Sequence, residues 1–111
     1  MAVISPANLG QGTLTAAAVA YATASGASKV IIKQATFTNT DTVARTITVY
    51  RVPSGGAAAV GNLIIQAQSL SAGQSYDPPS LKNLVLNPGE TLQALASTAA
   101  VVNIFVSGLT A

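Results

Sequence analysis

Residues 29–52 read KVIIKQATFTNTDTVARTITVYRV and form the least ambiguous stretch of the 111-residue sequence. Val, Ile, Thr, Phe and Tyr, which are enriched in β-strands, fill both arms of this stretch. Between the arms lies the polar segment Asn39-Thr40-Asp41-Thr42, and Asn and Asp side chains can hydrogen-bond their own backbone in a turn. The stretch therefore predicts a long central β-hairpin, to which the other segments are added as strands.

The first arm of this predicted hairpin carries apolar side chains on both faces. Strict alternation divides them into Val30, Ile32 and Thr36 on one face and Ile31, Ala35 and Phe37 on the other. A strand that is apolar on both faces is usually covered on both faces. We expect a second sheet to cover one face and another subunit to cover the other.

Residues 13–25, TLTAAAVAYATAS, suit either a helix or a strand. Ala, the best helix former, occurs six times in this segment. Small side chains take the even positions from 16 to 24, however, while β-forming residues such as Val19 and Tyr21 take odd positions. This alternation has the period of a strand, so we predict a strand that ends before Gly26.

Turn signals divide the remaining chain into further short strands. Residues 70–75 and 86–91 share a pattern of Leu, a small polar residue, a Gly at the fourth position, an acid or its amide, and a hydroxyl residue. In the second segment Pro88 and Gly89 suit a type II turn, because Pro presets φ and Gly accepts a positive φ. The strands predicted around these turns cover residues 62–68, 81–86, 92–97 and 101–107.

The last of these predicted strands has a clear alternation. Val102, Ile104 and Val106 share one face, and Phe105 takes the other face.

Seven or eight short strands separated by turns describe an all-β fold, an antiparallel β-sandwich of jelly-roll or immunoglobulin-like topology. The sequence leaves both topologies open. Residues 13–111 are expected to form this single domain. Residues 1–12 contain Pro6 and the G-Q-G of residues 10–12 without a periodic pattern, so we expect them to form an extended N-terminal arm.

Charged residues make up only 7% of the chain, against roughly 25% in an ordinary soluble domain. Thr, Ser, Asn, Gln and Ala must then form most of the surface. Because charge helps to keep soluble proteins apart, we expect much of this surface to be covered by partner subunits. The alternative is a monomer that is coated with Thr and Ser side chains.

The sequence contains no His and no Cys, which removes the commonest general base and the thiolate metal ligands. Asp77 and Glu90 are candidates for a glycosidase-type carboxylate pair. Asp77 precedes Pro78, however, and Glu90 follows Gly89, so both are interpreted as turn residues. We predict no catalytic, cofactor-binding or metal-binding residue, and we do not expect an enzyme.

Four of the five cations, Lys29, Lys33, Arg45 and Arg51, fall within residues 29–52. A nucleic-acid surface is one explanation, but solvated strand ends or a subunit contact explain these cations more simply, so no nucleic-acid partner is predicted. No apolar run approaches the roughly 20 residues that cross a bilayer, and no membrane association is predicted. A lectin-like role stays open, because sandwiches host many binding functions.

Four segments of the chain resemble small virion structural proteins of tailed bacteriophages. They are the strands with the N-T-D turn at residues 37–48, LIIQ at 63–66, VLNPGETLQALASTA at 85–99 and VNIFVSG at 102–108. Proteins of this kind are small β-sandwiches that decorate or cement capsids, or that occupy collar, tail and fibre positions, often as trimers or higher oligomers. The resemblance implies a virion part.

Together, the resemblance and the low charge predict a capsid decoration or cement protein, located in the virion and assembled in the host cytoplasm. Its expected partners are further copies of itself, with a trimer favoured, and other virion proteins such as the major capsid protein; no cofactor is expected. Alternatives are a tail, collar or fibre-base component and a receptor- or carbohydrate-binding sandwich. The residues expected at interfaces are the arm anchors Val3, Ile4, Leu9 and Leu14, together with Tyr21, Tyr50 and Phe105.

Overall fold

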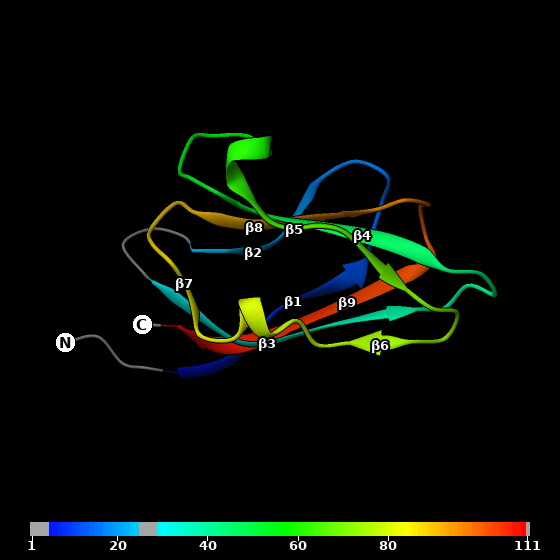
Figure 1. The fold of residues 1–111 in the computed structure, drawn as a ribbon. Coiled ribbons are helices and arrows are strands. Elements are labelled where there is room, and N and C mark those ends of the chain that lie inside the picture. The colour runs from blue at the N-terminus through cyan, green and yellow to red at the C-terminus, as the bar shows by residue number, and fades with distance from the viewer. Residues whose placement is uncertain (1–4, 25–28, 111) are drawn as a thin grey trace.

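Two antiparallel β-sheets face each other across an apolar core (Figure 1). The structure is a computed structural model that describes residues 5–24 and 29–110, with side chains from residue 8 onward. The predicted all-β sandwich is confirmed. Within the described ranges there is no α-helix, and the only helical segments there are two short 3-10 helices, η1 (Val60–Asn62) and η2 (Pro79–Leu81).

The strands divide between a five-stranded sheet, called sheet A, and a four-stranded sheet, called sheet B. Sheet A contains β1 (Ser5–Thr13), β9 (Val102–Thr110), β3 (Val30–Asn39), β6 (Ser75–Tyr76) and β7 (Leu84–Leu86). Sheet B contains β2 (Val19–Thr23), β8 (Thr91–Ala96), β4 (Arg45–Val52) and β5 (Leu63–Leu70).

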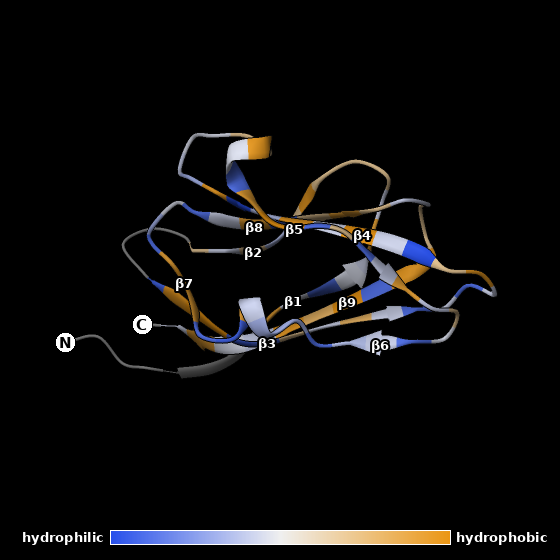
Figure 2. Ribbon diagram, viewed as in Figure 1, coloured by the Kyte–Doolittle hydropathy of each residue, from blue (hydrophilic) through white to orange (hydrophobic). Residues whose placement is uncertain are grey.

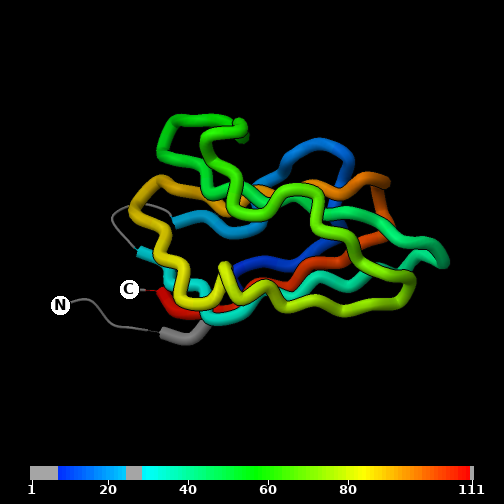
Figure 3. The backbone as a smooth tube through the Cα atoms, viewed as in Figure 1, coloured from blue at the N-terminus to red at the C-terminus, as the bar shows by residue number. Residues whose placement is uncertain are grey.

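The order of the strands identifies the topology as a jelly roll. The pairs are nested from the ends of the chain inward: β1 with β9, β2 with β8, β3 with β6 and β7, and β4 with β5. The chain is therefore one long antiparallel ribbon wound into two sheets, a path that Figure 3 traces. Since β6 and β7 pair with the two ends of β3, they form one interrupted strand, and the roll has eight strands.

The predicted central hairpin is wrong in its pairing, although both of its strands exist. β3 lies in sheet A and β4 lies in sheet B, so residues 40–44 cross from one sheet to the other. The buried side chain of Asn39 holds this crossing: its amide donates to the carbonyl oxygens of Val43, Leu70 and Ser71, and its Oδ1 accepts the N–H of Asp41. The predicted turn residue is thus the anchor of an arch between sheets.

A β-bulge corrects the predicted faces of β3. The register with β9 shifts between Ile32 and Gln34, so Lys33 is an extra residue. A shift of one residue moves every later side chain to the opposite face. Val30, Ile32, Ala35 and Phe37 therefore share the buried face, and the two-sided apolar strand of the sequence pattern does not occur in β3.

Residues 5–12, expected in a free arm, belong instead to β1 and pair with β9 along their length. The glycines of this strand allow β2 to approach. A Cβ on Gly10 would collide with the backbone carbonyl of Tyr21, and one on Gly12 would lie 3.4 Å from the Tyr21 ring. The Tyr21 hydroxyl donates to the Thr13 carbonyl at 3.0 Å, so Tyr21 closes this open side of the sandwich.

Residues 14–24 contain a shorter strand than predicted, and Ser25 lies outside the described residues. Residues 14–18 cross between the sheets, where the backbone N–H of Leu14 donates to Val102 at 2.7 Å, and only Val19–Thr23 form β2. The predicted strand at residues 81–86 is likewise shortened, because Pro78 and Pro79 lead into η2 and only Leu84–Leu86 pair with β3.

Both predicted glycine turns are present and share one mechanism. Gly73 and Gly89 have φ of 73° and 86°, which only glycine adopts readily. In each turn a side chain caps the first residue: Gln74 Oε1 accepts the N–H of Ser71, and Glu90 Oε1 accepts the N–H of Asn87, both at 2.7 Å. The acid or amide after each glycine is therefore a turn cap.

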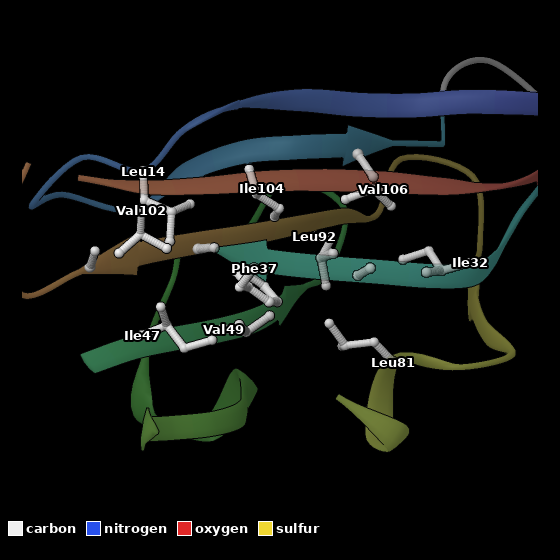
Figure 4. Close-up of a cluster of buried hydrophobic side chains, with 14 of the residues drawn as sticks. Leu14, Ile32, Phe37, Ile47, Val49, Leu81, Leu92, Val102, Ile104 and Val106 are labelled. Carbon is white, nitrogen blue, oxygen red and sulfur yellow. The ribbon is translucent and has the colours of Figure 1, made fainter. Parts of the chain in front are cut away.

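The core lies between the sheets and is built from inward-facing side chains of medium size (Figure 4). Phe37 is its largest fully buried side chain. Leu14, which was expected in the arm, is also fully buried there and is a core residue. In Figure 2 hydrophobic and hydrophilic residues alternate along strands such as β4 and β9, and the connecting loops are mixed.

Candidate interaction surface

The outer face of sheet A is the surface that the five-stranded sheet presents to solvent away from the core. On β9, Val102, Ile104 and Val106 are buried, so the residues between them point outward as predicted for Phe105. The face is made of Asn8, Gln11, Thr13, Ile31, Lys33, Gln34, Thr36, Thr38, Ser75, Val85, Asn103, Phe105, Ser107 and Leu109. Lys33 is its single charged residue.

Phe105 stands near the middle of this face. It is 51% exposed, and its neighbours in register are Gln11 on β1 and Thr36 on β3. A Phe side chain in this position exposes a large apolar area that folding leaves in contact with water. Exposed aromatic residues surrounded by polar ones are typical anchors of protein interfaces.

The polar side chains around Phe105 bond to one another. Asn8 donates to Gln11 at 2.9 Å, Thr13 donates to Asn103 at 3.4 Å, and the hydroxyls of Thr38 and Ser75 lie 3.0 Å apart. Covering a polar group is unfavourable mainly when it loses its hydrogen bonds. The polar groups in these pairs stay hydrogen-bonded to each other when water is excluded. Covering this face therefore leaves few polar groups unsatisfied.

A second apolar feature lies at the end of the face near the chain termini. Leu109 on β9, Ile31 on β3 and Val85 on β7 are opposite one another in register and form an apolar row across three strands. Val85 is exposed, and the other two are half-buried. Leu109 lies four positions after Phe105 along β9, which corresponds to about 13 Å in a strand.

The interruption between β6 and β7 is closed by polar contacts at the margin of this face. Lys33 Nζ donates to Asn83 Oδ1 at 2.7 Å, and Gln34 Nε2 donates to Asp77 Oδ2 at 3.3 Å. Asp77 also lies 3.7 Å from Lys82 Nζ. These side-chain contacts lie where the backbone hydrogen bonds between β3 and its neighbour are interrupted. They also hold the Lys33 ammonium on the β7 side of the face.

All three side-chain carboxylates, which lie within the described residues, are engaged in ion pairs. Besides Asp77, Asp41 pairs with Arg45 at 2.7 Å in the arch, and Glu90 pairs with Arg51 at 2.9 Å. The Arg45 hydrogen bond holds the pKa of Asp41 below its usual value, and the Asn87 backbone N–H does the same for the pKa of Glu90. The acids considered as a catalytic pair are therefore separate structural contacts.

The edge strands carry no charged side chains. β1, β2, β5, β6 and β7 contain no Asp, Glu, Lys or Arg in their described residues. Natural monomers commonly protect sheet edges with charged side chains, Pro or bulges. In β5 the edge is interrupted by two register shifts against β4 and by the positive φ of Ala67.

The outer face of sheet B differs from that of sheet A. Its aromatic residue is Tyr50, which is half-buried and lies opposite Gln93 and Leu63. The loop that carries η1 rises on this side of the molecule in Figure 1. Sheet A has no comparable loop over the centre of its outer face in that view.

The residues expected at interfaces thus fall into distinct environments. Phe105 is on the open outer face of sheet A, and Tyr50 is on that of sheet B. Tyr21 and Leu9 pack against the core, where burial raises the pKa of the Tyr21 phenol. Val3 and Ile4 lie outside the described residues. The apolar row of Ile31, Leu109 and Val85 was not predicted, because the bulge at Lys33 is not visible in the sequence pattern.

Two kinds of feature are absent from the described residues. In residues 5–24 and 29–110, no three His, Cys, Asp or Glu side chains come together as metal ligands would. The same residues contain no helix with the length and apolar character needed to cross a membrane.

Comparisons with known proteins concern the fold. No protein-family model matches the sequence, and no curated protein matches it. Similar solved structures include a chain of infectious bursal disease virus, Gt strain, at 11% identity and a TM-score of 0.47, covering 97% of this chain and 32% of that one. A chain of the Gx strain is 17% identical with a TM-score of 0.41, covering 97% and 28%. This chain spans about a third of their length.

Proposed function

We propose that the protein is a non-enzymatic structural component of a virion and that it acts there as a capsid decoration or cement protein. The observation that supports this best is a jelly roll whose edge strands carry no charge and whose sheet A presents an outer face with one charged residue. Jelly rolls are common in viral shells, although lectins and cupins use the same topology. The sequence resemblance to phage virion proteins favours the first of these classes.

The physical argument concerns what such a surface is suited to. Exposed edges and uncharged faces repel neighbouring proteins weakly. In a free monomer they promote unwanted association, whereas in an assembly they allow subunits to make contact. Each apolar Å² covered in a contact contributes roughly 25 cal/mol, before the entropy of association is subtracted. Repeated around a shell, contacts of this kind would brace it. The partners are other copies of the chain and virion proteins such as the major capsid protein.

Quantitative mass spectrometry of gradient-purified particles from the virus that encodes the chain would test this proposal. A decoration protein is expected at a copy number comparable to that of the major shell protein. A few copies per particle would contradict decoration and indicate a tail, collar or fibre position. Absence from purified particles would overturn the virion role altogether.

A further inference from the structure

We infer that the outer face of sheet A is the surface through which two copies of this chain associate, with β9 facing β9 about a two-fold axis. This inference rests on the proposed function, since it names the contact that an assembling subunit would use. It is carried by the arrangement of apolar, polar and charged side chains on that one face.

The apolar residues of the face are aligned on β9. Phe105 and Leu109 lie on the same side of this strand, with the exposed Ser107 between them. A two-fold axis that runs along β9 places each of these residues opposite its own copy. The two Phe105 rings then cover each other, and aromatic pairs contribute about 0.5–1.5 kcal/mol beyond their buried area. Leu109 and Ile31 extend the contact toward the chain termini.

The position of charge selects this axis over another. An axis that runs across the strands at Ser107 would bring Lys33 of one copy next to Lys33 of the other, which is repulsive. An axis along β9 exchanges the β3 side with the β1 side. Each Lys33 then faces the partner's β1, which has no charged residue. The lysine is also held toward Asn83 at the margin of the face.

Desolvation opposes this contact only weakly. The side chains of Asn8, Thr13 and Thr38 already bond to Gln11, Asn103 and Ser75, as described above. These bonds remain when the face is covered. An interface with satisfied polar pairs around a central aromatic residue has the anatomy of a stable protein contact.

The area of the proposed contact suits a dimer that depends on concentration. An axis along β9 overlaps β1, β9 and β3 of the two copies, and three strands about 4.8 Å apart and about nine residues long make a flat area on the order of 400 Å². This is smaller than the roughly 800 Å² per partner of a standard interface, so the dimer should dissociate on dilution. Two sheets that pack face to face keep their strands within about 30° of each other, which an axis along β9 permits.

The inferred two-fold contact differs from the trimer that the sequence resemblance favoured. A surface that pairs with its own copy is closed after two subunits, whereas a ring of three needs two different surfaces on each subunit. A shell lattice can still contain such dimers next to other contacts.

Cysteine crosslinking tests the arrangement directly, because the native chain contains no Cys. Ser107→Cys places one thiol near the proposed axis, and Ser69→Cys places one on exposed β5 of sheet B as a matched control. With a short bis-maleimide at micromolar protein, Ser107→Cys should give a dimer band at least 10-fold stronger than Ser69→Cys. Equal crosslinking of both variants, or none at position 107, would overturn the inference.

A second pair of variants tests the anchor. Phe105→Asp puts two carboxylates at the axis and should shift the protein to a monomer in light scattering, with at least a 30-fold weaker dimer. Tyr50→Asp makes the same kind of change on sheet B and should leave the dimer intact. Circular dichroism and a thermal melt confirm that both variants are folded. A dimer that survives Phe105→Asp, or a wild-type trimer, would contradict the contact.

These results are independent of the particle measurement. A chain that is abundant in particles but monomeric in solution and uncrosslinked at position 107 refutes this inference and leaves the virion role standing. A chain that dimerises through Phe105 but is absent from particles refutes the virion role and leaves the contact standing.

Discussion

Phe37 and Phe105 are the two phenylalanines of the chain, and they lie one register step apart on opposite faces of sheet A. Phe37 pairs with Ile104 and is fully buried, whereas Phe105 pairs with Thr36 and is 51% exposed. The same residue type in nearly the same place therefore meets core on one side and solvent on the other. The inner face of the sheet stabilises the fold, and the outer face is available for a partner.

The largest effect is expected from Phe37→Ala on the inner face. Removing a buried Phe leaves a cavity and should lower the free energy of unfolding by about 4 kcal/mol. Urea denaturation followed by circular dichroism measures this change. A loss below about 1 kcal/mol would break the comparison, because the inner face would then not determine stability.

Asn39→Ala tests the single buried polar side chain of the described core. The variant removes the amide that bonds three carbonyl oxygens in the arch, and it should lower the free energy of unfolding by about 3 kcal/mol. Asn103→Ala on the outer face, where the side chain is only partly buried, is the control and should change stability by less than about 1 kcal/mol. Equal losses in the two variants would contradict the role assigned to the arch.

Gly10→Ala and Gly12→Ala separate the backbone contact of β1 from its side-chain contact. A methyl group on Gly10 meets the Tyr21 carbonyl and forces the backbone apart, so we expect a loss of about 2 kcal/mol. A methyl group on Gly12 meets only the Tyr21 ring at 3.4 Å, and a loss below about 1 kcal/mol is expected. Thermal melts of the two variants should rank them in this order, and the reverse order would refute the packing of β2 on β1.

The pH dependence of stability should come from the ion-paired carboxylates rather than from the inner or the outer face of sheet A. The pKa values of Asp41 and Glu90 are lowered in the folded state, so their contribution is complete above the ordinary carboxyl pKa and is lost as pH falls through the lowered values. Stability should be flat from about pH 6 to 8 and should fall below about pH 4. Glu90→Gln, measured by denaturation at several pH values, should flatten the acid slope. An unchanged slope would exclude Glu90 as a contributor.

Phe105→Ala is expected to have the smallest effect on folding. Its side chain is already half exposed, so the free energy of unfolding of the monomer should change by less than about 0.5 kcal/mol at protein concentrations too low for association. Chemical denaturation at such dilution is the measurement. A loss close to that of Phe37→Ala would mean that both phenylalanines serve the fold.

The positions of most strands could be predicted because strand formation depends largely on local residue composition. The two glycine turns and the outward direction of Phe105 also follow from short patterns, since Gly73 and Gly89 need positive φ and alternation separates Phe105 from Ile104. These features depend on residues that are close in the sequence.

Pairing could not be predicted, because it is decided by distant contacts. Asn39 looks like a turn residue, and its role in an arch appears only when the carbonyl oxygens of Leu70 and Ser71 are brought beside it. The bulge at Lys33 is likewise set by the register with β9, and it hides the apolar row of the outer face. The G-Q-G of β1 was interpreted as part of a free arm, because the residue that approaches these glycines, Tyr21, lies in the other sheet.

Light scattering of the purified wild-type protein across a dilution series tests the central claim most directly. If the outer face of sheet A is an association surface, the mass should correspond to two chains at tens of micromolar and should fall toward one chain on dilution. A mass of one chain at every concentration, including several hundred micromolar, would contradict the claim that this face joins two copies.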